Sequence, residues 1–159
     1  MNIVFFDIDG TLAKGTQIPP TAVNALHQLR LNGSIIFICT GRPYHYAYRH
    51  FYRYANGFIT NNGRYAHMGC CEVLVDLPHK QITHNDHEIY YGINAVYCSP
   101  DNPEYASLIK KYGKARVHTT LSDKQTIYNT STDHPVYEEA IKIIQQYFHN
   151  AEIKNEFLS

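Results

Sequence analysis

The stretch IVFFDIDGTL, residues 3–12, decides the fold of this chain. It begins with a run of β-branched and aromatic residues without polar alternation, which is typical of a strand buried on both faces in a parallel sheet. It ends in two carboxylates one residue apart, Asp7 and Asp9, followed by Gly10, where we expect the chain to turn. Ligands of open α/β sheets bind at this edge of the sheet. Two carboxylates there can hold Mg²⁺, or can supply a nucleophile and a proton carrier.

Composition limits the classes of protein to which the chain can belong. Its 159 residues are 44% hydrophobic and 18% charged, which is typical of one ordinary globular domain or two small ones. The formal net charge is zero, so we expect neither a nucleic acid nor an anionic membrane as a partner. The sequence has no signal-like start and no apolar run of membrane-spanning length. Its four cysteines include no C-x-x-C spacing, and we expect a reduced, cytoplasmic setting.

A second apolar run, residues 34–40, follows a helical stripe that begins near two prolines and ends at Asn32-Gly33. Strand, helix and strand form a βαβ unit, so the two strands are predicted to be parallel and to end at the same edge of the sheet. This places Thr40 beside Asp7 and Asp9. The Thr40 hydroxyl and the backbone N–H groups around Gly41, at the start of the next helix, suit an oxyanion such as phosphate.

Residues 57–60 are predicted to form a short third strand that ends at Asn61-Asn62-Gly63. Asn-Gly is a strong turn signal, so Asn62 has a turn role whether or not it also lies near the site. Residues 64–68 and 72–77 then form a predicted strand pair. Beyond residue 80 the chemical signal is weak, and the pattern indicates strands at 90–97, 124–130 and 151–157. Helices are predicted at 102–112 and 134–149.

The helix predicted from residue 43 to 54 is dense in aromatic residues. Four of them share one helical face: Tyr44, Tyr48, Phe51 and Tyr52. The pattern is typical of a helix packed on the sheet. The alternative is a stacking platform for nucleic acid, which the neutral charge of the chain disfavours.

The segment DIDGTL, residues 7–12, resembles the first motif of the haloacid dehalogenase (HAD) superfamily of phosphotransferases. The segment ICTGRP, residues 38–43, resembles the second motif of its Cof-like branch, where a third strand also ends in Asn-Gly. The resemblance implies an α/β fold: a partial Rossmann-like parallel sheet core with an inserted α+β cap domain of type IIB. Residues 1–80 would be the N-terminal half of the core with a hairpin flap, and residues 81–159 would be the cap.

The resemblance also implies a mechanism, that of a Mg²⁺-dependent phosphatase for a small phosphorylated metabolite. Asp7 would attack phosphorus and form an aspartyl-phosphate, Asp9 would serve as the general acid and base, and both would bind Mg²⁺. The phosphoryl oxygens would be held at Gly10, Thr40 and Gly41. Substrate contacts would come from Arg42 and Asn62, although Arg42 reads equally well as a surface arginine at a helix start.

Two motifs of the superfamily are not found in the sequence. The third motif supplies a lysine and the fourth a Gly-Asp pair, yet the chain contains no Gly-Asp pair. We therefore expect either a fragment of a longer phosphatase or a shortened relative, with a catalytically inactive binding or assembly module as the alternative. Without the fourth core strand, residues 3–6 would form an exposed edge. A homodimer partner or the missing C-terminal core segment would then pair there.

Overall fold

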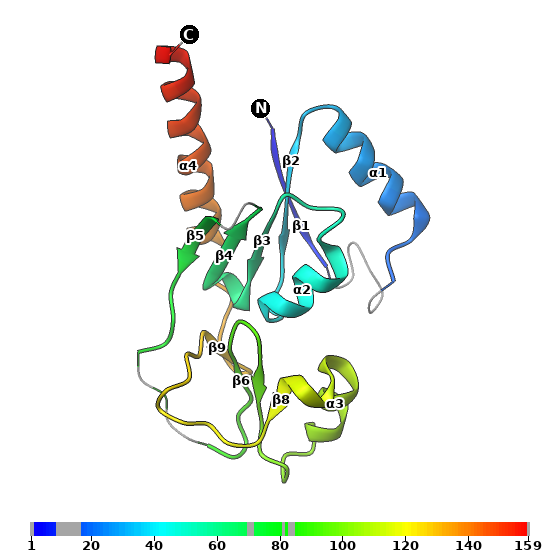
Figure 1. The fold of residues 1–159 in the computed structure, drawn as a ribbon, viewed down its shortest axis with the longest axis vertical. Coiled ribbons are helices and arrows are strands. Elements are labelled where there is room, and N and C mark those ends of the chain that lie inside the picture. Colours follow the sequence, from blue (N-terminus) through cyan, green and yellow to red (C-terminus); the bar gives the residue numbers. More distant parts are fainter. Residues whose placement is uncertain (1, 9–16, 70–71, 81, 83–84, 159) are drawn as a thin grey trace.

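The computed structural model describes residues 2–8, 17–69, 72–80, 82 and 85–158, and the side chains among them up to residue 151 (Figure 1). Asp9 and Gly10 lie outside the described residues. Two sheets make up the fold. The first sheet carries helices on both faces, and the second, smaller sheet lies below the carboxyl ends of the first strands (Figure 1).

The first sheet has the strand order β1-β2-β3-β4-β5. The first three strands are parallel, whereas β4 and β5 are antiparallel to their neighbours. This confirms the α/β class and the hairpin expected after the third strand. The strands are β1 (Ile3–Asp7), β2 (Ile35–Cys39), β3 (Gly57–Thr60), β4 (Tyr65–Met68) and β5 (Glu72–Asp76).

Successive residues of a strand point to opposite faces of the sheet, and in the buried strands both sets of residues are apolar. Helices therefore cover both faces of this sheet. On one face, α1 (Pro20–Leu31) and α2 (Tyr44–Phe51) pack against Ile36 and Ile38 of β2. On the other face, α4 (Tyr137–Leu158) packs against Phe37, which lies between those two isoleucines. The Phe37 and Phe148 rings meet edge to face at 6.2 Å.

The second unit is a four-stranded sheet of order β8-β7-β6-β9 with one helix. Its core contains Val96 and Leu108, and Tyr46 of α2 belongs to the same buried cluster. The two units are therefore packed together through α2. The elements are β6 (Tyr90–Tyr91), β7 (Val96–Tyr97), α3 (Tyr105–Tyr112), a 3₁₀ turn at Lys114–Arg116, β8 (Val117–His118) and β9 (Asn129–Thr130). Another 3₁₀ turn, Asn61–Gly63, connects β3 to β4 in the first sheet.

The last helix differs from the expected arrangement in two ways. The strand predicted at 151–157 was wrong, because α4 continues to Leu158. The range 81–159 was also expected to be cap, yet α4 packs on the first sheet. The reason is the spacing of Ala140, Ile144 and Phe148, which places three buried side chains on one helical stripe against the face of the sheet opposite α1 and α2.

The strands of the second unit are shorter than the sequence predicted. The run 90–97 divides into β6 and β7 because the chain turns between them, where Gly92 N donates to Ala95 O at 2.9 Å. The run 124–130 contributes only β9. None of the described helices combines the length and the apolar character that a membrane crossing needs.

Strand β1 forms one edge of the first sheet. It pairs with β2 from Ile3↔Ile35 to Asp7↔Cys39, and no other strand of the described residues pairs with it. Residues 3–6 are only half buried, although their composition suits a strand covered on both sides. The backbone groups on the outer side of β1 thus have no sheet partner within the described part of the chain.

Candidate active site

The carboxyl ends of β1, β2 and β3 form the edge at which the candidate residues gather. Asp7 is exposed at the end of β1, and its register partner on β2 is Cys39. Burial and the nearby negative charge of Asp7 raise the pKa of the Cys39 thiol to about 12. Cys39 therefore stays protonated at neutral pH, and Asp7 is the charged and accessible group of this pair.

Thr40 follows β2 and is held from both sides. Its N–H donates to Ile59 O at 2.8 Å, and its own carbonyl accepts from Asn62 N at 3.3 Å. The Thr40 Oγ1 accepts a hydrogen bond from Arg42 N at 3.1 Å. A hydroxyl that accepts one bond still has its O–H hydrogen to donate. The buried Thr40 thus combines a fixed position with a remaining donor at the edge of the sheet that carries Asp7.

Gly41 is required by the close approach of Asn62. A Cβ atom at Gly41 would lie 2.5 Å from Asn62 Oδ1. The Asn62 side chain is itself tethered, because its Nδ2 donates to Asp133 O at 3.2 Å and its Oδ1 accepts from the Tyr137 hydroxyl at 3.5 Å. The structure thus brings Thr40, Gly41 and Asn62 together.

Arg42 turns into the molecule. Its guanidinium lies over the Tyr46 ring, 4.6 Å from the centroid, and the residue is half buried. Its positive charge also lowers the pKa of Tyr112 on α3, against the larger effect of burial, which raises it. The sequence equally allowed Arg42 to be a surface arginine at a helix start. The structure instead shows a half-buried side chain.

Asn61 is a residue of the site that the sequence did not single out. It is fully buried with a φ of 53°, and Asn62 beside it has a φ of 57°. Its Nδ2 donates to Gly92 O at 3.0 Å and to Asn129 Oδ1 at 3.2 Å, and its Oδ1 accepts from Thr60 Oγ1 at 2.8 Å. Asn61 thus joins the first sheet to the second unit. The sequence signal that could have indicated this role is the pair of consecutive asparagines, because asparagine tolerates a left-handed backbone.

One connection between the units follows β5, with residues 77–80 described, and another, residues 131–136, lies between β9 and α4; a side-chain contact joins the two. His79 Nε2 lies 2.7 Å from Asp133 Oδ2. Burial raises the pKa of Asp133, but hydrogen bonds from His79 and from Thr130 N outweigh burial and lower it overall. The second connection also reaches the site, because Val136 N donates to Asn62 O at 2.8 Å.

A cavity of about 430 Å³ lies between the two units. The first sheet contributes Gly41, Arg42 and Asn62 to its lining, and the second unit contributes β6, α3 and β9 residues. The second-unit residues with polar side chains that line it are Tyr91, Glu104, Lys111, Tyr112, Asn129, Thr130 and Ser131. This cavity therefore places the predicted phosphate-binding turn opposite a polar wall.

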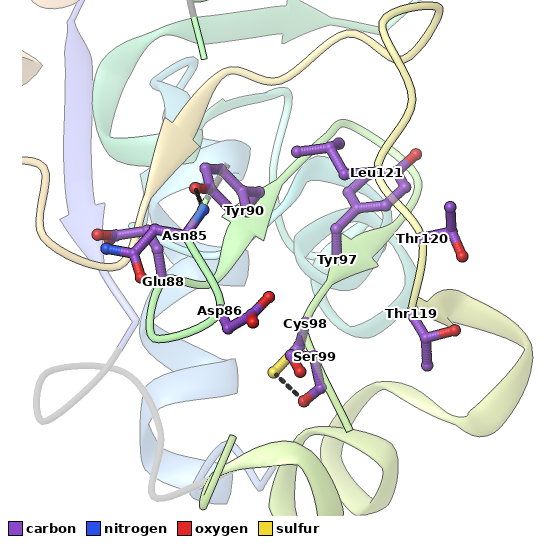
Figure 2. A pocket seen from close by; sticks show the side chains of 10 residues that line it. All are labelled: Asn85, Asp86, Glu88, Tyr90, Tyr97, Cys98, Ser99, Thr119, Thr120 and Leu121. Atoms are coloured by element: carbon purple, nitrogen blue, oxygen red, sulfur yellow. Dashed lines mark hydrogen bonds between the residues drawn. The ribbon is translucent and has the colours of Figure 1, made fainter. Parts of the chain in front are cut away.

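A second cavity, of about 220 Å³, lies wholly within the second unit (Figure 2). Glu88 is one of its lining residues, and Glu88 Oε1 accepts hydrogen bonds from Ser131 Oγ, Thr132 N and Thr132 Oγ1. Burial raises the pKa of Glu88, but these bonds lower it overall. The Glu88 carboxylate thus holds the turn at residues 131–132 in place through these hydrogen bonds.

The chemistry of the described residues fits Mg²⁺ at one position. Asp7 presents an exposed carboxylate, the oxygen donor that Mg²⁺ prefers. The described residues contain no group of three or more histidine, cysteine, aspartate or glutamate side chains that could enclose a metal ion. The remaining residue predicted to bind the metal, Asp9, is outside them, as is Gly10 of the phosphate site.

A comparison of the sequence with protein families decides the affiliation. The profile of the haloacid dehalogenase-like hydrolases matches residues 4–158. The chain belongs to this family. No curated protein matches the sequence significantly.

Solved structures of HAD proteins share the fold. A HAD/Cof-like hydrolase from Plasmodium vivax is 15% identical over 94% of this chain and 74% of its own length, with a TM-score of 0.66. A haloacid dehalogenase-like hydrolase from B. subtilis is 20% identical over 68% and 42%, with a TM-score of 0.57. The HAD subclass IIB sugar phosphatase BT4131 is 23% identical over 80% and 56%, with a TM-score of 0.55. The chain thus spans about half the length of the last two.

Proposed function

We propose that this chain carries part of the active site of a Mg²⁺-dependent HAD phosphatase acting on a small phosphorylated metabolite. The observation that supports this best is the convergence of Thr40, Gly41 and Asn62 at the strand edge that bears Asp7, facing a cavity closed by the second unit. In this proposal residues from about 80 to the start of α4 serve as the cap. The first sheet with α1, α2 and α4 serves as the core.

The residues divide the chemistry between them. The Asp7 carboxylate attacks phosphorus as the bond to the leaving oxygen breaks, which gives an aspartyl-phosphate. Asp9 donates a proton to that oxygen and then takes one from the water that hydrolyses the intermediate. The Thr40 hydroxyl and the N–H groups near Gly10 and Gly41 hold the phosphoryl oxygens. Asp7 and Asp9 would hold Mg²⁺, which would supply positive charge to offset that of the phosphoryl group.

A sugar phosphate is the substrate type that we favour. The cavity presents amide, hydroxyl and phenol groups, with Asn129, Thr130 and Ser131 on the second unit, and such groups pair with the hydroxyls of a sugar. The fold is shared with the subclass IIB sugar phosphatase BT4131. The likeness in fold supports this choice only as an analogy.

Beryllofluoride, which stands in for the phosphoryl group, tests the assignment. We expect the 159-residue chain with Mg²⁺ to give a ¹⁹F NMR signal of bound beryllofluoride, and we expect Asp7→Asn to abolish it. Asp101→Asn, an exposed aspartate of the second unit, is the matched control and should leave the signal unchanged. Binding that survives Asp7→Asn, or no bound signal with the unaltered chain, would refute the proposal.

A second candidate is a catalytically inactive binding or assembly module. The sequence contains no Gly-Asp pair of the fourth HAD motif, and the outer edge of β1, with which no other described strand pairs, offers a place for a partner strand. That strand would come from a second copy or from the remainder of a HAD core. Turnover of p-nitrophenyl phosphate separates the two candidates. An inactive module would bind beryllofluoride but release no p-nitrophenol, either alone or with a HAD C-terminal core segment added.

A further inference from the structure

We propose that Arg42 and Lys111 form an anion subsite, so that the substrate is a phosphorylated metabolite with a second acidic group in its leaving portion. This inference rests on the proposed function and deepens it. It assigns a role to Lys111, which belongs to none of the motifs of the family, and it narrows the class of substrate.

The geometry of the cavity wall supports the subsite. The two cations come from different units, Arg42 from the turn after β2 and Lys111 from the last turn of α3. Both lie beside one pair of rings: the Arg42 guanidinium lies over Tyr46, whose ring is 5.5 Å from that of Tyr112, and Lys111 Nζ lies 5.9 Å from the Tyr112 ring centroid. Both residues also line the same cavity. An anion in front of Tyr112 is therefore within the field of two positive charges.

The charge of the lining has the required sign. Among the residues that line the cavity, those with ionisable basic or acidic side chains are Arg42, Lys111 and Glu104, two basic and one acidic. The tyrosines do not alter this sum, because burial raises the pKa of Tyr91 to about 12 and raises that of Tyr112 as well. The negative charge of Glu104 also raises the pKa of Tyr91.

The location separates this subsite from the phosphoryl group. The transferred phosphoryl is assigned to Asp7 and Thr40 at the strand edge, whereas Tyr112 lies on α3 of the second unit (Figure 1). The Arg42 N–H donates to Thr40 Oγ1 in the predicted phosphate-binding turn, and the Arg42 guanidinium lies over Tyr46, which belongs to the same buried cluster as Tyr112. A substrate with acidic groups at two ends fits this arrangement.

Two matched pairs of probes test the subsite. Glucose 6-phosphate and 6-phosphogluconate differ by a carboxylate, and fructose 6-phosphate and fructose 1,6-bisphosphate differ by a phosphate. Calorimetric titration of the chain with Mg²⁺ should show the doubly acidic member of at least one pair binding about tenfold tighter or more, as one charge-assisted hydrogen bond would give. The pair that shows the larger ratio identifies the acidic group.

Lys111→Met should bring that ratio close to one while leaving the affinity for the singly acidic member unchanged. Lys110→Met is the control, because Lys110 is exposed on the same helix and does not line the cavity. Equal binding of both members by the unaltered chain would overturn the inference. So would an equal loss for both members in Lys111→Met, which would place Lys111 on the transferred phosphoryl, and so would the absence of binding by every probe. Beryllofluoride binding at Asp7 in the same preparation shows whether the proposed function survives.

Discussion

Replacing Asn61 with alanine tests the link between the two units most directly. The change removes a side chain that is fully buried and that makes all of its hydrogen bonds with buried or backbone groups. Three groups would lose their hydrogen bonds to the Asn61 side chain: the Thr60 hydroxyl, the Gly92 carbonyl and the Asn129 amide oxygen. The backbone would remain at a φ of 53°, which alanine adopts less readily than asparagine.

The expected loss of stability is large for a chain of this size. Each buried group left without a partner costs about 1–3 kcal/mol, and the left-handed backbone adds about 1 kcal/mol for alanine. Taking the lower value for each of the three partners gives a loss of about 4 kcal/mol in the free energy of unfolding. The free energy of unfolding of a typical domain is about 5–15 kcal/mol, so Asn61→Ala should be only marginally stable.

Urea denaturation followed by circular dichroism measures this loss. Asn61→Gly loses the same hydrogen bonds but adopts a positive φ freely, so it should be about 1 kcal/mol more stable than Asn61→Ala. Asn32→Ala is the control, because Asn32 is exposed with a φ of −81°. A loss below about 1 kcal/mol in Asn61→Ala would mean that water replaces the side chain, and the reasoning about the buried network would be refuted.

The remaining predictions concern the phosphate turn and pH. Gly41→Ala should displace Asn62, since the new Cβ would meet Asn62 Oδ1 at 2.5 Å, and it should weaken beryllofluoride binding. Unchanged ¹⁹F NMR signals would contradict this. Burial, aided by nearby Arg116 and Arg49, lowers the pKa of His45, whose Nε2 is buried and has no hydrogen-bond partner among the described residues. The unfolded chain then binds more protons, so stability should fall as the pH drops below the unfolded value of about 6.5. His45→Gln should flatten this dependence in thermal denaturation at a series of pH values, and an unaltered slope would exclude His45 as its cause.

The sequence predicted the first sheet well because its signals are local. The apolar run from Ile3, the βαβ unit and the Asn-Gly turn each follow from a few adjacent residues, and the parallel topology then fixes which strand ends meet. For the same reason the sequence predicted that the strands before Asp7 and Thr40 are parallel neighbours, whereas for Asn62 it indicated a turn role. Asp9 and Gly10 stay predictions, because they lie outside the described residues.

Contacts between distant segments could not be predicted in this way. The pairing of Asn61 with Asn129, and the position of Lys111 in the cavity, depend on how the second unit packs on the first. The surface that helix α4 covers could not be predicted for a related reason. Its apolar stripe was visible, but a stripe does not state which surface it covers, and the uncovered face of the first sheet lies far away in the sequence. Short strands such as β9 are held by their neighbours rather than by local propensity.

The connection between β9 and α4 also ties the second unit to the predicted phosphate site. His79 pairs with Asp133 of this connection, Asp133 O accepts from Asn62 Nδ2, and Val136 N donates to Asn62 O. A displacement of this connection would therefore move Asn62, whose Oδ1 fills the space next to Gly41.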